Sequence, residues 1–190
     1  MSAQVEGGST PRSRVIAAAE ALFLERGVHA TSLQMIADRI GVTKAAVYFQ
    51  FRSKDEIVRA VIAPAIARIT EMVAMAEAEV SAPRRFDLAL DGLVGVVVER
   101  GEVAAMLRRD AEVTGMVDNN ADFRGLMARL DGLLIGPEPS PDAKVALALA
   151  GGGLMAVGSD PTWKQLDADG FRRSLRQAVQ RVLGPYRPLD

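Results

Sequence analysis

Residues 31–57 read TSLQMIADRIGVTKAAVYFQFRSKDEI, and they carry the strongest structural signal in the chain. Its first part places apolar residues on one face of a helix, at Leu33, Ile36, Ala37 and Ile40. Gly41 then favours a tight turn, and we expect a second helix from Thr43, with Val47 and Phe51 facing the core. This layout is that of a helix-turn-helix, whose second helix enters the major groove of DNA.

Polar residues at the helix starts set the expected boundaries. Thr31 with Gln34, and Ser53 with Glu56, match the capping box, in which each side chain bonds a backbone N–H left free at a helix start. We therefore expect the first helix of the pair to begin at Thr31. The helix that begins at Ser53 is expected to reach about residue 80, with Pro64 as a kink.

The outer side of the second helix combines residues suited to DNA. Lys44 and Tyr48 share a polar-tipped face, while Ala45 and Ala46 are small enough for a close approach to base edges. Thr43 offers a hydroxyl and free backbone N–H groups to a phosphate. For Tyr48, a partly buried core position is the alternative.

The charge distribution supports a local affinity for phosphates. The chain has a net charge of −1, but residues 39–54 hold four basic residues and no acidic one. A positive strip of this kind attracts phosphates at short range. For Lys44 and Lys54 taken singly, a solvated surface position is the alternative.

Composition excludes several classes of site. Hydrophobic residues make up 49% of the chain and charged residues 25%, as in soluble globular proteins. The absence of cysteine excludes disulfides, thiolate metal sites and a cysteine nucleophile. His29 is the only histidine, so no metal site is expected, and Gly151–Gly153 lacks the Lys-Ser or Lys-Thr pair of a phosphate-binding loop, so no cofactor is expected.

The N-terminus lacks the apolar stretch of a signal peptide, and the longest apolar run, residues 145–158, is short for a membrane span. We therefore expect a cytoplasmic protein without a membrane partner.

The chain is predicted to be all-α, with about nine helices. A helix from Thr10-Pro11 to Gly27 precedes the helix-turn-helix. The expected organisation is a flexible arm at 1–9, a three-helix DNA-binding domain at 10–57, and a helical domain for ligand binding and dimerisation at 58–190. In the latter, helices are expected at about 86–100, 102–111, 118–135, 142–158 and 168–183.

The stretch 31–57 resembles the DNA-binding signature of the TetR/AcrR family of bacterial transcriptional regulators. The resemblance covers roughly residues 12–60, and it is carried by Thr31-Ser32, Ile36-Ala37, Gly41-Val42, Tyr48 to Phe51, and Ser53-Lys54-Asp55. It implies phosphate contacts at Thr31, Thr43, Tyr48 and Lys54, and base edges near Lys44, Ala45 and Ala46. Gln50 stands where the family often has His or Tyr, so it is expected to contact a phosphate or an adenine edge.

Two further sets of residues are predicted in the C-terminal domain. Apolar and methionine side chains could line an effector pocket, with ordinary core as the alternative: Met72, Met75, Val94, Val98, Met106, Met116, Phe123, Met127 and Met155. Small and apolar residues of the last two long helices are expected at the dimer interface that the family forms: Ala146, Ala150, Gly153, Val157, Leu175 and Val182. Trp163 is expected to be a packing anchor.

Together these expectations describe a homodimeric repressor that binds a near-palindromic double-stranded operator and is released by a small-molecule effector. A helical adaptor without DNA-binding activity is the alternative from another class. An enzyme is disfavoured, since no nucleophile is paired with a base.

Overall fold

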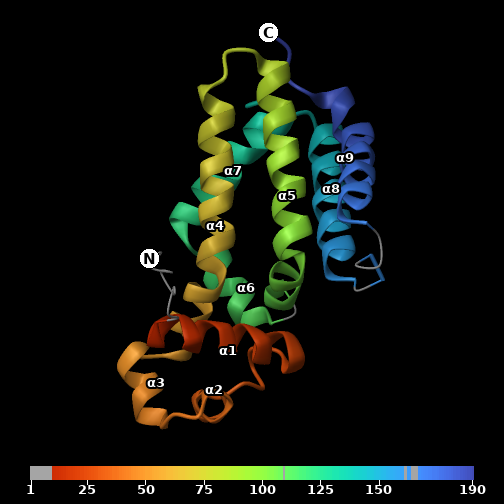
Figure 1. Cartoon of the computed structure of the whole chain (residues 1–190). Helices are drawn as coiled ribbons and strands as arrows, with labels where there is room; N and C mark the ends of the chain where they lie inside the picture. The colour runs from red at the N-terminus through yellow and green to blue at the C-terminus, as the bar shows by residue number, and fades with distance from the viewer. Residues whose placement is uncertain (1–9, 109, 161, 164–166) are drawn as a thin grey trace, which may run out of the picture. The chain divides into compact units, whose positions relative to one another are not determined.

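The computed structural model describes residues 10–108, 110–160, 162–163 and 167–190, excluding the side chains of 104–108, 111 and 112. The predicted arm at 1–9 lies outside this description. Within the described residues the regular elements are all helical, which confirms the predicted all-α class (Figure 1). The chain forms two compact units that divide after Ile62, rather than after Ile57 as expected.

The first unit contains α1 (Pro11–Arg26), α2 (Leu33–Ile40), α3 (Lys44–Gln50) and the start of α4 (Lys54–Ala78). Its core is made of fully buried apolar side chains from all four helices, among them Phe23, Ile36, Val47, Phe51 and Ile57. Thr10 caps α1 by accepting a hydrogen bond from the Ser13 N–H at 3.1 Å.

The predicted start of the second helix is wrong, because α2 begins at Leu33 and its capping residue lies one position later than expected. Ser32, not Thr31, caps α2, and its hydroxyl accepts from the Met35 N–H at 3.2 Å. Gln34 bonds Asp38 at 2.7 Å instead of returning to the helix start. The Thr31 hydroxyl turns inward, because it can donate there to a carbonyl of the preceding loop.

The second unit is built around α5 (Ala82–Arg108), which packs against α7 (Ala121–Ile135), α8 (Pro141–Ser159) and α9 (Ala168–Leu183) (Figure 1). The short α6 (Ala111–Asp118) follows α5, and a 3₁₀ turn, Gly184–Tyr186, ends α9. Arg176 of α9 lies between Asp87 and Asp91 of α5, and these carboxylates raise the pKa of its guanidinium.

Two predicted boundaries in this unit are wrong. The helices expected at 86–100 and 102–111 are one helix through residue 108, because Gly101 does not end it. A Cβ on Gly101 would lie 2.6 Å from Gly158 Cα, so this glycine permits close packing of α5 on α8. The helix expected at 118–135 begins at Ala121 as α7, and Asn120 caps it by accepting from the Phe123 N–H at 3.0 Å. Residues 111–118 form α6, a separate helix that the prediction lacked.

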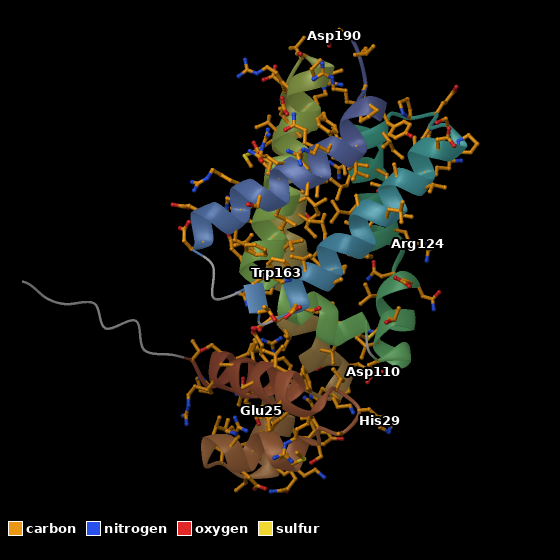
Figure 2. The ribbon with its side chains drawn as sticks, turned by 90° about the vertical axis from the view of Figure 1, so that its right-hand side faces the viewer. Glu25, His29, Asp110, Arg124, Trp163 and Asp190 are labelled. Carbon is orange, nitrogen blue, oxygen red and sulfur yellow. The ribbon has the colours of Figure 1, made fainter. Side chains whose placement is uncertain are left out.

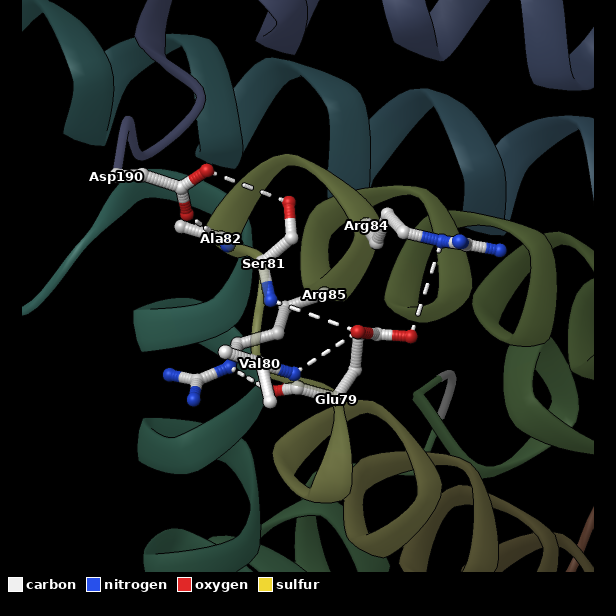
Figure 3. Close-up of polar contacts among 7 residues, drawn as sticks. All are labelled: Glu79, Val80, Ser81, Ala82, Arg84, Arg85 and Asp190. Carbon is white, nitrogen blue, oxygen red and sulfur yellow. Dashed lines mark hydrogen bonds and ion pairs between the residues drawn. The ribbon is translucent and has the colours of Figure 1, made fainter.

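The last residue, Asp190, bonds the start of α5 (Figure 3). Its carboxylate accepts from the Ala82 N–H at 2.6 Å and from the Ser81 hydroxyl at 3.4 Å. A carboxylate at a helix N-terminus satisfies a free N–H and favours the helix dipole. Among the helices of the described residues, none combines the length and the apolar character that a bilayer crossing requires.

Candidate nucleic-acid interface

Helix α3 presents one side to the core and the other to solvent. Val47 and Phe51 are fully buried, as the spacing predicted. The side chains of Lys44, Ala45, Ala46, Tyr48 and Phe49 are exposed. For Tyr48, 47% exposure excludes the core position that was the alternative. Gln50 is half-buried beside this face.

Thr43 caps α3 as predicted, and its hydroxyl accepts from the Ala46 N–H at 3.2 Å. Gly41 ends α2 at φ 69°, ψ 38°, a left-handed conformation that a side chain would strain. The backbone N–H of Gly41 bonds back to α2, so the turn between the helices is fixed at both ends.

Two arginines of α1 hold the C-terminal ends of α2 and α3. Arg12 donates to the Gln50 carbonyl at 2.9 Å, and its guanidinium lies 4.1 Å from the centre of the Phe51 ring. Arg14 donates to the Ile40 carbonyl at 3.1 Å. Cations at helix C-termini are favoured because the last carbonyls carry partial negative charge. Sequence analysis missed both residues, since nothing in their local pattern distinguishes them from solvated arginines.

Thr31 does not offer its side chain to a ligand. It is 2% exposed, and its hydroxyl donates to the Gly27 carbonyl at 2.8 Å. The expected phosphate contact at this side chain is therefore wrong, because the hydroxyl closes the loop between α1 and α2 from the inside.

Lys54 is half-buried at the start of α4. Its ammonium donates to the Val28 carbonyl at 3.0 Å, with the His29 carbonyl at 3.5 Å. An ammonium has three hydrogens, so this tether leaves one for a phosphate. Ser53 accepts from the Glu56 N–H at 3.2 Å, while the Glu56 carboxylate accepts from the Arg52 N–H at 2.8 Å.

The basic residues around α3 differ in how far they are neutralised. Arg39 forms a two-pronged ion pair with Glu25, at 3.0 and 2.7 Å, and this hydrogen bond lowers the pKa of the Glu25 carboxyl. Lys44 and Arg52 are exposed, and the described residues give neither an ion-pair partner. The unbalanced positive charge is therefore at the two ends of α3.

His29 is exposed in the loop between α1 and α2 (Figure 2). Among the described residues, no three potential metal-ligating side chains lie together.

The predicted effector-pocket residues differ in how deeply they are buried in the second unit. Met72 and Val94 belong to the buried core of the second unit, with Val98, Met127 and Met155 packed against it. Met116 and Phe123 are half-buried outside that cluster. Met75 is 57% exposed and lies outside this core, whereas Met72, Val73 and Ala76 form the buried face of α4. The side chain of Met106 lies outside the described residues.

The predicted dimer residues also include both buried and exposed positions. Ala146, Ala150 and Leu175 are each only 7% exposed within their own unit, so their prediction as interface residues is wrong. Gly153 and Val182 are exposed and Val157 is half-buried. Helix α8 instead exposes an apolar stripe, defined by Val145, Ala148, Leu149, Gly152, Gly153 and Ala156. Trp163, labelled in Figure 2, is 39% exposed. Its ring stacks on that of Phe171 at 6.2 Å between ring centres.

Comparison with known proteins gives a family match to the first unit. Residues 15–61 match the family model described as bacterial regulatory proteins, tetR family. The HTH-type transcriptional regulator TtgR of Pseudomonas putida is 42% identical over 57 residues, which are 30% of this chain and 27% of TtgR. The HTH-type transcriptional repressor BepR of Brucella suis is 31% identical over 117 residues, which are 62% of this chain and 54% of BepR.

The fold of the whole chain also has solved counterparts. The fatty acid degradation regulator FadR of Bacillus halodurans aligns with a TM-score of 0.66 at 16% identity, covering 97% of this chain and 100% of that one. At this identity the likeness concerns the fold. The sequence matches span about a quarter of TtgR and about half of BepR.

Proposed function

We propose that the chain is a sequence-specific DNA-binding transcription regulator of the TetR family, since its residues 15–61 match the model of that family and TtgR is 42% identical over 57 residues. The observation that supports this most is α3, whose outer side is exposed while both of its ends are fixed by side chains. A helix held in this way can read base edges without losing further conformational freedom on binding.

The proposed contacts follow from the exposed side of α3. Ala45 and Ala46 lie against base edges, because their small side chains let the helix enter the groove. Lys44 contacts a base edge or a phosphate, and the hydroxyls of Thr43 and Tyr48 contact phosphates. These five side chains are all exposed.

Two residues beside this face complete the proposed set. Gln50 is half-buried at the end of α3, where its amide can reach a phosphate or an adenine edge. Lys54 contacts a phosphate with the hydrogen that its two carbonyl partners leave. Each basic contact releases about one counterion, so binding should weaken steeply with salt.

We place the dimer contact on the apolar stripe of α8, with Ala178 and Val182 of α9 beside it. Val145 is 58% exposed and Leu149 is 68% exposed, and the glycines among them allow close backbone approach. Contiguous exposed apolar surface on a folded protein marks an interaction site. A two-fold dimer through this stripe presents two copies of α3, and the operator is therefore near-palindromic.

This dimer is testable with charged substitutions. The double variant Val145→Glu, Leu149→Glu should be monomeric in light scattering, since two carboxylates per subunit would be buried in the interface. Leu88→Glu on α5, where Leu88 is 42% exposed, is the matched control and should stay dimeric. If the double variant remains a dimer, the dimer interface does not lie on the apolar stripe of α8.

The effector is proposed to be an apolar small molecule that binds the second unit. Its core includes Met72 and Val94, with Met127 and Met155 packed against it, and methionines adapt readily to a bound ligand. Binding acts only through a different affinity for the DNA-fitting and non-fitting states. BepR is named a transcriptional repressor, and by analogy we propose that this chain represses its operator and that the effector releases it.

The test is selection of bound sequences from random duplex DNA, followed by binding measurements across a salt series. One near-palindromic site with a steep salt dependence supports the proposal. A folded dimer that selects no sequence would favour a helical adaptor. The proposed role is regulation in the cytoplasm, where the operator lies, and it is not catalytic.

A further inference from the structure

Phe49 is the most exposed aromatic side chain in the described part of the chain. It is 80% exposed, whereas Phe23, Phe51 and Phe86 are at most 1% exposed. Tyr48 beside it is 47% exposed and ends in a hydroxyl that water can solvate. Sequence analysis did not single out Phe49, although its position two residues after the buried Val47 carries the signal.

The helix geometry aims Phe49 away from the unit's core. Successive helical residues are about 100° apart, so Phe49 lies about 200° around the axis from Val47. Ala45, four residues earlier, is on the same side of the helix and is exposed as well. Ala45 and Phe49 therefore form an apolar strip on the side of α3 opposite to its core contact.

The charge around this strip indicates what can cover it. Lys44 and Arg52 stand next to it at the two ends of α3, both exposed. Residues 39–54 contain no acidic side chain. An apolar ligand has no charge that could pair with Lys44 and Arg52. A polyanion that also carries an apolar group can pair with these cations and cover the apolar strip at the same time. In the major groove, the apolar spot on the base edges is the C5-methyl group of thymine.

We propose that Phe49 packs against the C5-methyl group of one thymine at a fixed position in each operator half-site. This inference rests on the proposed function, because it requires α3 to lie in the major groove. It deepens that function by assigning one base of the operator to one side chain. Phe49 then selects by apolar contact where Lys44 and Tyr48 act by charge and hydrogen bonding.

The experiment replaces the thymines of the selected site by deoxyuridine, one position at a time, which removes the methyl group and leaves base pairing intact. Affinities are measured for the wild-type protein, for Phe49→Ala and for Leu24→Ala. Leu24 is a matched control, because it is an exposed apolar residue, 40% exposed, on α1. Removing a buried methyl group should raise the Kd by about fourfold at the contacted position.

The expected result is one position per half-site at which uracil weakens the wild-type protein and the Leu24→Ala variant, but not Phe49→Ala. Phe49→Leu should keep part of the discrimination, since it retains an apolar side chain. The melting temperature of Phe49→Ala should match the wild type, because the ring makes little contact with the core. This check separates a lost contact from a lost fold.

Two outcomes would overturn the inference while leaving the proposed function intact. One is sequence-specific binding with no position sensitive to uracil. The other is a uracil-sensitive position that persists in Phe49→Ala. If the proposed function itself is wrong, the wild-type protein selects no DNA sequence. This outcome differs from the two above, and it also excludes a thymine contact.

Discussion

The contact between Gly101 of α5 and Gly158 of α8 makes a sharp prediction about stability. In Gly101→Ala, the new Cβ would lie 2.6 Å from the Cα and 2.7 Å from the carbonyl oxygen of Gly158. Both are backbone atoms, so α5 and α8 must separate. Overpacking of this kind costs about 1–3 kcal/mol, while alanine in a helix gains up to about 1 kcal/mol over glycine. With about 2 kcal/mol for the overpacking and about 0.8 kcal/mol for the helical gain, we expect a net loss of about 1 kcal/mol.

The matched control is Gly125→Ala on α7, where nothing lies within 4 Å of the added Cβ. This variant keeps the helical gain without the clash, and it should be more stable than the wild type by up to about 1 kcal/mol. Thermal unfolding followed by circular dichroism measures both, at about 2–4 °C per kcal/mol for a chain of this size. If Gly101→Ala is as stable as the wild type, the close packing of α5 on α8 is refuted.

Three further predictions concern single side chains. Lys54→Ala should lower the salt slope of DNA binding by about one. It should also lower the melting temperature slightly, because the Val28 carbonyl loses one of its two donors and keeps only the Thr31 N–H. An unchanged salt slope would leave Lys54 as a structural tether alone. Thr31→Val should lower the free energy of unfolding in urea by about 1 kcal/mol, since the part-buried Gly27 carbonyl loses the Thr31 hydroxyl, while Thr31→Ser retains the bond. Neither Thr31 variant should change the DNA affinity of the folded protein. A loss of DNA affinity in folded Thr31→Val, but not in Thr31→Ser, would support the phosphate contact first expected at Thr31. The hydrogen bond from Arg129 lowers the pKa of Glu77 below 4.5, so its stabilisation is present above that pH and lost as the pH falls through the folded pKa. The stability difference between wild type and Glu77→Gln should therefore be larger at pH 7 than at about pH 3, and a difference independent of pH would exclude this ion pair as its source.

The helix-turn-helix could be predicted because its signals are local. Gly41 in a left-handed turn, the Thr43 cap, and the spacing of Val47 and Phe51 each depend on residues within one or two helical turns. Even there, the sequence offers two adjacent hydroxyl residues, Thr31 and Ser32, as the cap of α2, and the structure shows that Ser32 is the cap. Thr31 could take the buried position because its hydroxyl reaches the Gly27 carbonyl, a contact that no local pattern reveals.

The C-terminal unit was harder to predict because α8 is small and apolar on more than one side. Ala146 and Ala150 face the unit's own core, while Val145 and Leu149, one residue earlier in each case, face outward. Helical periodicity cannot decide between two apolar faces when both are present. The helix end predicted near residue 100 was wrong for a related reason. A glycine that ends a helix and a glycine that lets a neighbouring backbone pack closely, as Gly101 does, look the same in the sequence.

Contacts between distant residues escaped sequence analysis altogether. Arg12 and the Gln50 carbonyl are 38 residues apart, and Arg14 and the Ile40 carbonyl are 26 apart. Asp190 bonds the start of α5 across 108 residues. Each of these depends on the fold being formed, so only the structure assigns these charged side chains to the helix ends they hold.

The position of α3 in the major groove of two dyad-related half-sites can be tested directly by site-directed cleavage of the DNA. The chain has no cysteine, so a DNA-cleaving iron chelate can be attached to a single introduced thiol, with Ala46→Cys on α3 and Leu24→Cys on α1 as the control. If α3 lies in the major groove, Ala46→Cys gives two clusters of strand cleavage, related by the dyad of the selected site and separated by about 10 base pairs or a multiple of this. Weak or uniform cleavage from Ala46→Cys, with stronger and localised cleavage from Leu24→Cys, would contradict this position of α3.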